Sequence, residues 1–157
     1  MRTTLVLLML TGVIALPLRA EAAAPVVAVH SAAGKFDDVK ERAVMAIENR
    51  GMVLNYTARV GNMLERTGKD LGRPRQIYTH AEVLEFCSAA LSRETMEADA
   101  HNIAFCPYSI AVYVLPQEPG KVYVSYRRLA TGGSGRSAKA LGAVEKLLED
   151  IVREALR

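Results

Sequence analysis

Two cysteines, a histidine and a tyrosine form the group of residues in this sequence whose types could do chemistry together. Cys106 lies five residues after His101 and two before Tyr108, and Cys87 precedes it by nineteen residues. Thiolate and imidazole are ligands that zinc and copper accept, and two thiols can also be oxidised to a disulfide. The four side chains therefore define a candidate ligand or redox site.

Three interpretations of the cysteine pair stay open at this stage. The pair is a structural disulfide or two buried thiols, a set of ligands for a metal or haem iron, or a redox couple. Redox catalysts usually hold their thiols two residues apart at the N-terminus of a helix, where the thiolate is stabilised. Only Cys87, in "CSAALS", comes before an expected helix. A bridge would close a loop of eighteen residues and contribute about 3 kcal/mol on the chain-entropy model.

The other two histidines, His30 and His80, are weaker candidates for metal ligands. The sequence contains no H-x-x-x-H, C-x-x-C or H-E-x-x-H pattern that would bring such donors together. No serine lies in a G-x-S-x-G motif, and "TGGSG" (131–135) lacks the lysine of a phosphate-binding loop. These absences favour a protein that is not an enzyme, and they leave the identity of any cofactor open.

The N-terminus has the three-part layout of a secretory signal peptide. A basic start at Arg2 is followed by an apolar run from Leu5 to Leu18 and by the small-residue motif "AEA", which ends at Ala22. The run is shorter than the roughly 20 residues that span a bilayer. We therefore expect cleavage after Ala22, a periplasmic location and no membrane attachment of the mature chain.

The charge balance points to no particular partner. The chain has 20 basic and 17 acidic residues, of which two basic and one acidic precede the cleavage site, so the mature net charge is about +2. Export also argues against nucleic acid as a partner, and the pair Arg127-Arg128 is interpreted as a solvated strand end. A small ligand or a protein partner is compatible with this composition, and the oligomeric state is left open.

The mature chain, about 135 residues long, alternates between strand-like and helix-like periodicity and is long enough for one domain with a core. We predict an α+β fold, a mainly antiparallel sheet with helices packed on one face, as a single compact domain. Asn62 is expected to cap the second helix. The expected order is strand 26–32, helix 36–51, strand 52–60, helix 62–72, strand 82–87, helix 91–99, strand 102–116, strand 121–129 and helix 138–157.

The chain is accordingly divided into four parts. Residues 1–22 are the signal peptide, 23–130 the α+β domain, 131–137 a flexible link and 138–157 an amphipathic C-terminal helix. Along that last helix Leu141, Val144 and Ile151 form one apolar stripe.

The central part of the sequence resembles the family of domain of unknown function 302. Members have a cysteine after a strand, a helix that ends in "EAD", and a second cysteine that opens an apolar strand. These features match Cys87, the "EAD" at 97–99, Cys106 and the run from Ile110 to Leu115. The opening helix and the strand after it match residues 36–54. The resemblance covers residues 26–128, with "CPYSIAVY" here where "LPCNVVVY" is frequent.

This resemblance implies a compact α+β fold and two cysteine positions, but no established reaction. The family's cytoplasmic members argue against an obligatory disulfide, because their compartment is reducing. Our leading hypothesis is a periplasmic, non-enzymatic domain that binds a small ligand, with metal or haem among the candidates, near Cys87, His101, Cys106 and Tyr108. The alternatives are a thiol-dependent redox or sulfur-handling protein, and an interaction module that docks through its hairpin edge or C-terminal helix.

Overall fold

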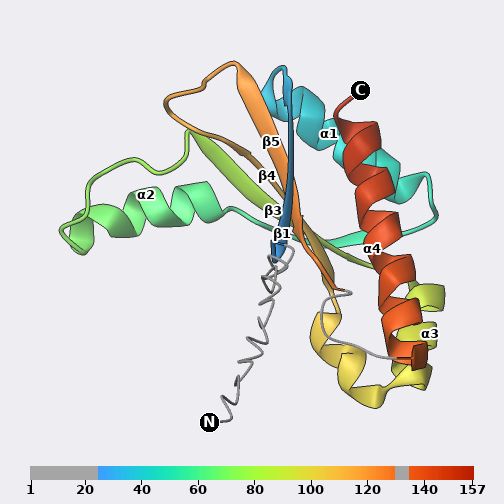
Figure 1. The fold of residues 1–157 in the computed structure, drawn as a ribbon. Coiled ribbons are helices and arrows are strands. Elements are labelled where there is room, and N and C mark those ends of the chain that lie inside the picture. Colours follow the sequence, from blue (N-terminus) through green and yellow to red (C-terminus); the bar gives the residue numbers. More distant parts are fainter. Residues whose placement is uncertain (1–24, 130–134) are drawn as a thin grey trace, which may run out of the picture.

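The computed structural model describes residues 25–129 and 135–157, so the expected signal peptide (1–22) and most of the expected link lie outside the described residues. Five strands and four α-helices follow one another in the order that the periodicity predicts, with one additional 3₁₀-helix (Figure 1). The elements are β1 (Val27–Ala33), α1 (Phe36–Glu48), β2 (Val53–Ala58), α2 (Val60–Asp70), β3 (His80–Cys87), α3 (Ala89–Ala98), η1 (Ala100–Phe105), β4 (Tyr108–Val114), β5 (Lys121–Arg127) and α4 (Gly135–Ala155).

The five strands form one antiparallel sheet in the order β1-β5-β4-β3-β2. Beta-branched and aromatic residues alternate along β4 and β5, and the turn at Pro119-Gly120 reverses the chain between them. Helices α1 and α4 pack against each other and cover one face of this sheet (Figure 1). The α+β prediction is therefore confirmed.

The hydrophobic core lies between that covered face and the apolar stripes of α1 and α4. Every second residue of β4 and β5 points into it, as the period of two in a strand requires. The apolar stripe of the last helix is also buried here, so it is part of the core and not an exposed docking surface. The largest fully buried side chains are Phe86, Ile47, Leu84, Ile110, Leu148, Ile151, Val39, Val112, Val122, Val124, Val144 and Val152.

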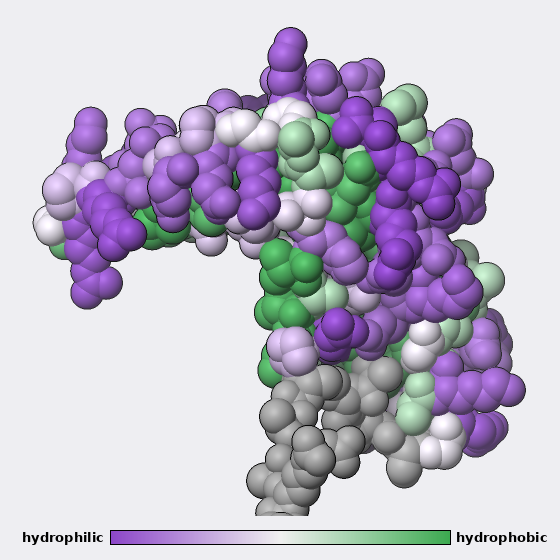
Figure 2. All heavy atoms as spheres, turned by 45° about the horizontal axis from the view of Figure 1, so that its top comes forward, coloured by the Kyte–Doolittle hydropathy of each residue, from purple (hydrophilic) through white to green (hydrophobic). Residues whose placement is uncertain are grey.

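The opposite, outer face of the sheet is not covered by α1 or α4. Helix α2 projects from the body beyond β3, and none of its residues is buried (Figure 1). Val27 and Val29 of β1 are exposed, and Figure 2 shows hydrophobic atoms in green where α2 meets the body. Within the described residues, no helix is both long and apolar enough to cross a membrane.

Three local predictions were wrong. Residues 100–105 form the 3₁₀-helix η1 and not the start of a strand, because the Asp99 carboxylate accepts a hydrogen bond from the backbone N–H of His101 (2.9 Å) and caps a tight turn. Helix α2 begins at Val60 with Arg59 in the capping position, so Asn62 is not its cap. Helix α4 begins at Gly135, inside the segment expected to be a link.

Candidate functional site

The register between β3 and β4 brings the two cysteines together. Phe86 lies opposite Tyr108 in this antiparallel pair, so the residue after Phe86 and the residues before Tyr108 meet where the strands end. The intervening residues form α3 and η1, which leave the sheet and return to it. Cys87 therefore ends one strand and Cys106 stands just before the next, although they are far apart in sequence.

The two thiols are in contact, and two hydroxyl groups lie beside them. The Sγ atoms of Cys87 and Cys106 are 3.1 Å apart. The Ser92 hydroxyl, from the first turns of α3, lies 3.9 Å from the Cys106 Sγ and donates to the Tyr108 hydroxyl at 3.2 Å. Tyr108 is itself only 3 % exposed and packs edge-on against Phe86. Three of the four candidate residues thus form one cluster.

The electrostatics of the cluster favour the neutral thiol. The pKa of the Cys87 thiol is raised to about 11, mainly by burial and then by the hydrogen bond with Cys106 and the charge of Cys106. A hydrogen bond with the Tyr108 backbone has a smaller effect in the opposite direction. Burial also raises the pKa of Tyr108, while the hydroxyls of Ser92 and Thr95 act in the opposite direction. The thiolate of Cys87, which is the nucleophilic and metal-binding form, is therefore disfavoured.

The histidines do not join this cluster. His101 is exposed on η1. His30 contacts Glu149 of α4 at 3.0 Å, and His80 stacks on Phe36 with ring centroids 4.9 Å apart. Among residues 25–129 and 135–157, no three His, Cys, Asp or Glu side chains are grouped as a metal site requires. The described side chains therefore do not fit a metal or haem iron held by cysteine together with histidine.

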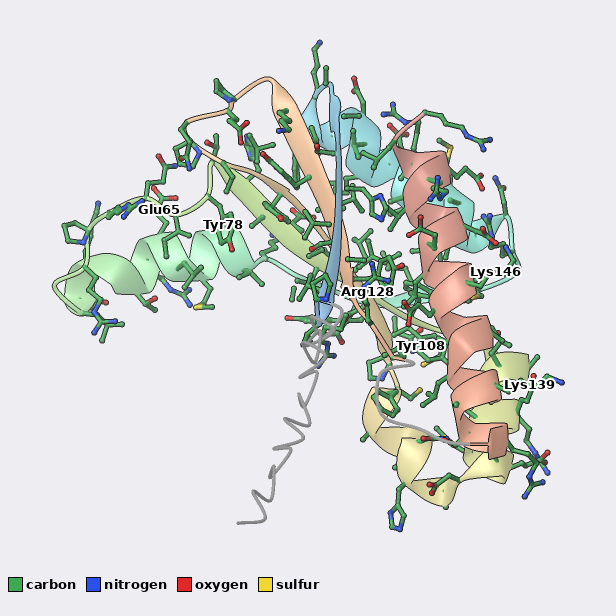
Figure 3. The ribbon with its side chains drawn as sticks, in the orientation of Figure 1. Glu65, Tyr78, Tyr108, Arg128, Lys139 and Lys146 are labelled. Carbon is green, nitrogen blue, oxygen red and sulfur yellow. The ribbon has the colours of Figure 1, made fainter. Side chains whose placement is uncertain are left out.

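A partly open cavity of about 200 Å³ lies beside Cys106, whose chain neighbours line it although neither cysteine does. It lies at the end of the sheet where η1, β4 and β5 approach α4, and Figure 3 shows Tyr108 and Arg128 at this end of the molecule. The residues on both sides of Cys106 belong to its wall. The cavity is lined by Val26, Phe105, Pro107, Tyr108, Ser109, Arg127, Arg128, Leu129 and Leu148.

Arg128 has a specific place in that wall. Its Nη1 donates to the Glu145 carboxylate of α4 at 2.9 Å, and the same carboxylate accepts the backbone N–H of Leu129 at 3.1 Å. Its Nε is buried and finds no hydrogen-bond partner in the part of the chain that the structure describes. The interpretation of Arg127-Arg128 as a solvated strand end is therefore wrong for Arg128, which lies in the cavity wall and contacts α4. The amphipathic α4, with Glu145 beside its apolar stripe, was the available signal for a charged partner.

Comparison with known families supports the resemblance read from the two cysteines. Residues 27–155 match the family model described as domain of unknown function DUF302. The chain belongs to the DUF302 family. That match includes α4, so the C-terminal helix lies within the family's own extent and is not an addition to it.

A solved structure of a DUF302 protein has the same fold. The crystal structure of an uncharacterized conserved DUF302 protein from Bacillus stearothermophilus superposes with a TM-score of 0.70 at 15% sequence identity, over 85% of this chain and 100% of that chain. At this identity the likeness concerns the fold alone. A search of curated proteins finds no match to this DUF302 chain.

Proposed function

We propose that this DUF302 domain is a non-enzymatic binding domain that takes a small ligand with an apolar body in the cavity beside Cys106. The observation that carries the proposal is the cavity itself. Its wall is mainly apolar, with Phe105, Leu129 and Leu148 contributing, and a few polar groups stand among them. Small-molecule sites in proteins have this composition, with polar groups that orient the ligand.

The volume limits the ligand. A cavity of about 150 Å³ in an engineered protein binds benzene, so a space of about 200 Å³ fits a single ring or a short aliphatic chain. The Cys87 thiol is not activated, because burial and the neighbouring Cys106 raise its pKa to about 11. This supports binding in preference to covalent catalysis at the cavity.

Filling the cavity tests the proposal. Ser109 lies in its wall on the outer face of β4, so Ser109→Leu should occupy part of the space and abolish ligand-induced shifts in melting temperature. Ser31→Leu is the matched control, because Ser31 lies on the same face of the sheet in β1, away from the cavity. Screening small aromatic and aliphatic compounds against both variants decides the question. Equal responses of the two variants would contradict binding at this cavity.

A second candidate function rests on the contact between the two sulfur atoms. A disulfide between Cys87 and Cys106 would form by exchange with a disulfide-bearing oxidant, which takes up the two thiol hydrogens and leaves as two thiols. The Sγ separation of 3.1 Å supports this thiol-dependent redox or sulfur-handling role. The raised pKa of Cys87 slows attack by that thiol, which supports a stable bridge in preference to rapid turnover.

We also propose that the domain acts in the periplasm, on the strength of the sequence of residues 1–22. Fusing residues 1–30 to a reporter enzyme that is active only after export tests the location. An Arg2→Glu and Leu8→Asp double variant of the fusion is the control, because it removes the basic start and interrupts the apolar run. Reporter activity that is the same in both fusions would contradict export by this segment.

A further inference from the structure

The cavity beside Cys106 carries an excess of positive charge that its apolar wall does not explain. Arg127 and Arg128 both line it, and the carboxylate in contact with Arg128 is that of Glu145. One carboxylate balances one of the two guanidinium groups. Arg127 is exposed, so its charge is not costly in itself, but the excess of positive charge at the mouth of the cavity attracts an anion to this position.

The buried Nε of Arg128 gives a more specific indication. Its Nη1 donates to Glu145 at 2.9 Å, while the Nε–H is buried and has no acceptor among residues 25–129 and 135–157. An unsatisfied buried donor costs about 1–3 kcal/mol and needs an explanation. Because the Nε atom is buried as the side chain stands, a small shift of Arg128 would let an oxygen atom of a ligand in the cavity accept this hydrogen bond.

We propose that the ligand is a small monocarboxylate with an aromatic or short aliphatic body. The carboxylate would accept hydrogen bonds from Arg128 Nε and from the Arg127 guanidinium, and the apolar body would contact the rings and methyl groups of the wall. Planar guanidinium groups match carboxylate geometry, which makes these the stronger kind of hydrogen bond. This inference rests on the proposed binding function and names its ligand class.

Benzoate, benzamide and acetate are the probes that separate charge from shape. Benzamide is a neutral molecule of nearly the same shape as benzoate, and acetate carries the charge without the ring. Titration of the mature chain, followed by the backbone amide signals of Ser109 and Leu129, should give an affinity for benzoate at least about tenfold above the other two. Raising the salt concentration should reduce this preference.

Three arginine variants locate the anion. Arg127→Gln should weaken benzoate binding about tenfold and leave benzamide binding unchanged. Arg128→Lys keeps a cation beside Glu145 but removes the Nε–H, and it should also weaken benzoate binding. Arg75→Gln is the control, because Arg75 lines a different hollow beside α2 and should affect neither probe. Melting temperatures of all three variants report whether each is folded.

The possible results separate the two levels of the proposal. Binding of benzamide as tight as benzoate, or benzoate binding that withstands both Arg127→Gln and Arg128→Lys, would overturn the monocarboxylate class but leave cavity binding in place. Two negative results together would overturn both the monocarboxylate class and cavity binding. These are no response to any of the three probes at millimolar concentration, and equal responses of Ser109→Leu and Ser31→Leu in the compound screen. Loss of benzoate binding in Arg127→Gln and Arg128→Lys, but not in Arg75→Gln, supports both the monocarboxylate class and binding in the cavity.

Discussion

The Sγ atoms of Cys87 and Cys106 lie 3.1 Å apart, although nineteen positions separate the residues in sequence. The antiparallel register that pairs Phe86 with Tyr108 creates this contact, and the α3–η1 excursion closes the loop between them. A disulfide needs an S–S distance of about 2.05 Å. A movement of about 1 Å, within reach of a side-chain rotation, would therefore convert the pair into a bridge.

The first prediction is that mild oxidation joins the two cysteines within one molecule. Incubation with oxidised glutathione should remove two hydrogen atoms from the intact mass and block alkylation of both Cys87 and Cys106. Because the bridge restricts the unfolded chain, the free energy of unfolding should rise by about 3 kcal/mol. Chemical denaturation with and without reductant measures the difference.

The double variant Cys87→Ser/Cys106→Ser is the control for this comparison. Its stability should not depend on the reductant, and it should match the reduced wild type to within about 1 kcal/mol if the thiols only fill space. A wild-type protein that stays reduced under these conditions, or that forms only bridges between molecules, would contradict the prediction.

The second prediction concerns the reactivity of the reduced pair. Burial and the neighbouring Cys106 raise the pKa of the Cys87 thiol to about 11 from an ordinary value of 9.0. Only the thiolate is alkylated, so at pH 8 the rate at Cys87 should be about a hundredfold below that of an exposed thiol. Iodoacetamide labelling followed by peptide mass mapping gives the rate for each cysteine.

The pH profile is the sharper part of this test. The labelling rate of Cys87 should keep rising through pH 10, where an ordinary thiol has already reached its plateau. The same chain unfolded in urea provides the ordinary thiol for comparison. A plateau near pH 7 in the folded protein would show an activated thiolate, and it would move the redox function ahead of ligand binding.

Most of the fold was predictable because each element has a strong local pattern. The stripe from Phe36 to Ile47 identifies α1, and the alternation in β4 and β5 identifies the central hairpin. The pattern did not predict η1, because the apolar residues Ile103 and Phe105 are typical of a strand. Ile103 is in fact exposed, and the carboxylate of Asp99 determines the turn there.

The candidate site was predicted only in part, for a related reason. The contact between the cysteines depends on the pairing of β3 with β4, which local periodicity does not specify. His101 lies as close to Cys106 in sequence as a ligand would, but the tight turn of η1 leaves it exposed. The ion pair of Arg128 with Glu145 joins a strand to a distant helix, so no short motif records it.

The third prediction tests whether α4 belongs to the core. Ile151 is fully buried against the other core residues, so Ile151→Ala should lower the free energy of unfolding by about 2–5 kcal/mol. Ile77→Ala is the matched control, because Ile77 is 52 % exposed, and it should change stability by no more than about 1 kcal/mol. Urea denaturation followed by circular dichroism measures both. Similar small effects would indicate that α4 is a docked appendage.

The fourth prediction concerns the contact between Tyr126 of β5 and Glu149 of α4. The Tyr126 hydroxyl donates to the Glu149 carboxylate at 2.9 Å, and burial together with this carboxylate raises the pKa of Tyr126 to about 12. Between about pH 10 and 12 the unfolded chain has lost the phenolic proton that the folded chain keeps. Stability should therefore fall as pH rises through this window, by on the order of 2 kcal/mol for this group.

At acidic pH the same pair changes stability in the opposite direction, because the free energy of unfolding then falls as pH falls. Burial alone would raise the pKa of Glu149, but the hydrogen bond from Tyr126 and the charges of His30 and Arg153 outweigh it and lower that pKa. The contribution of Glu149 is thus present above its ordinary pKa and is lost as pH falls through the lowered value. Denaturation of wild type and Tyr126→Phe across the pH range checks both limbs. Tyr126→Phe should flatten the alkaline limb, because phenylalanine has no proton to release. Curves of equal slope above pH 10 would show that Tyr126 is not what couples alkaline pH to unfolding.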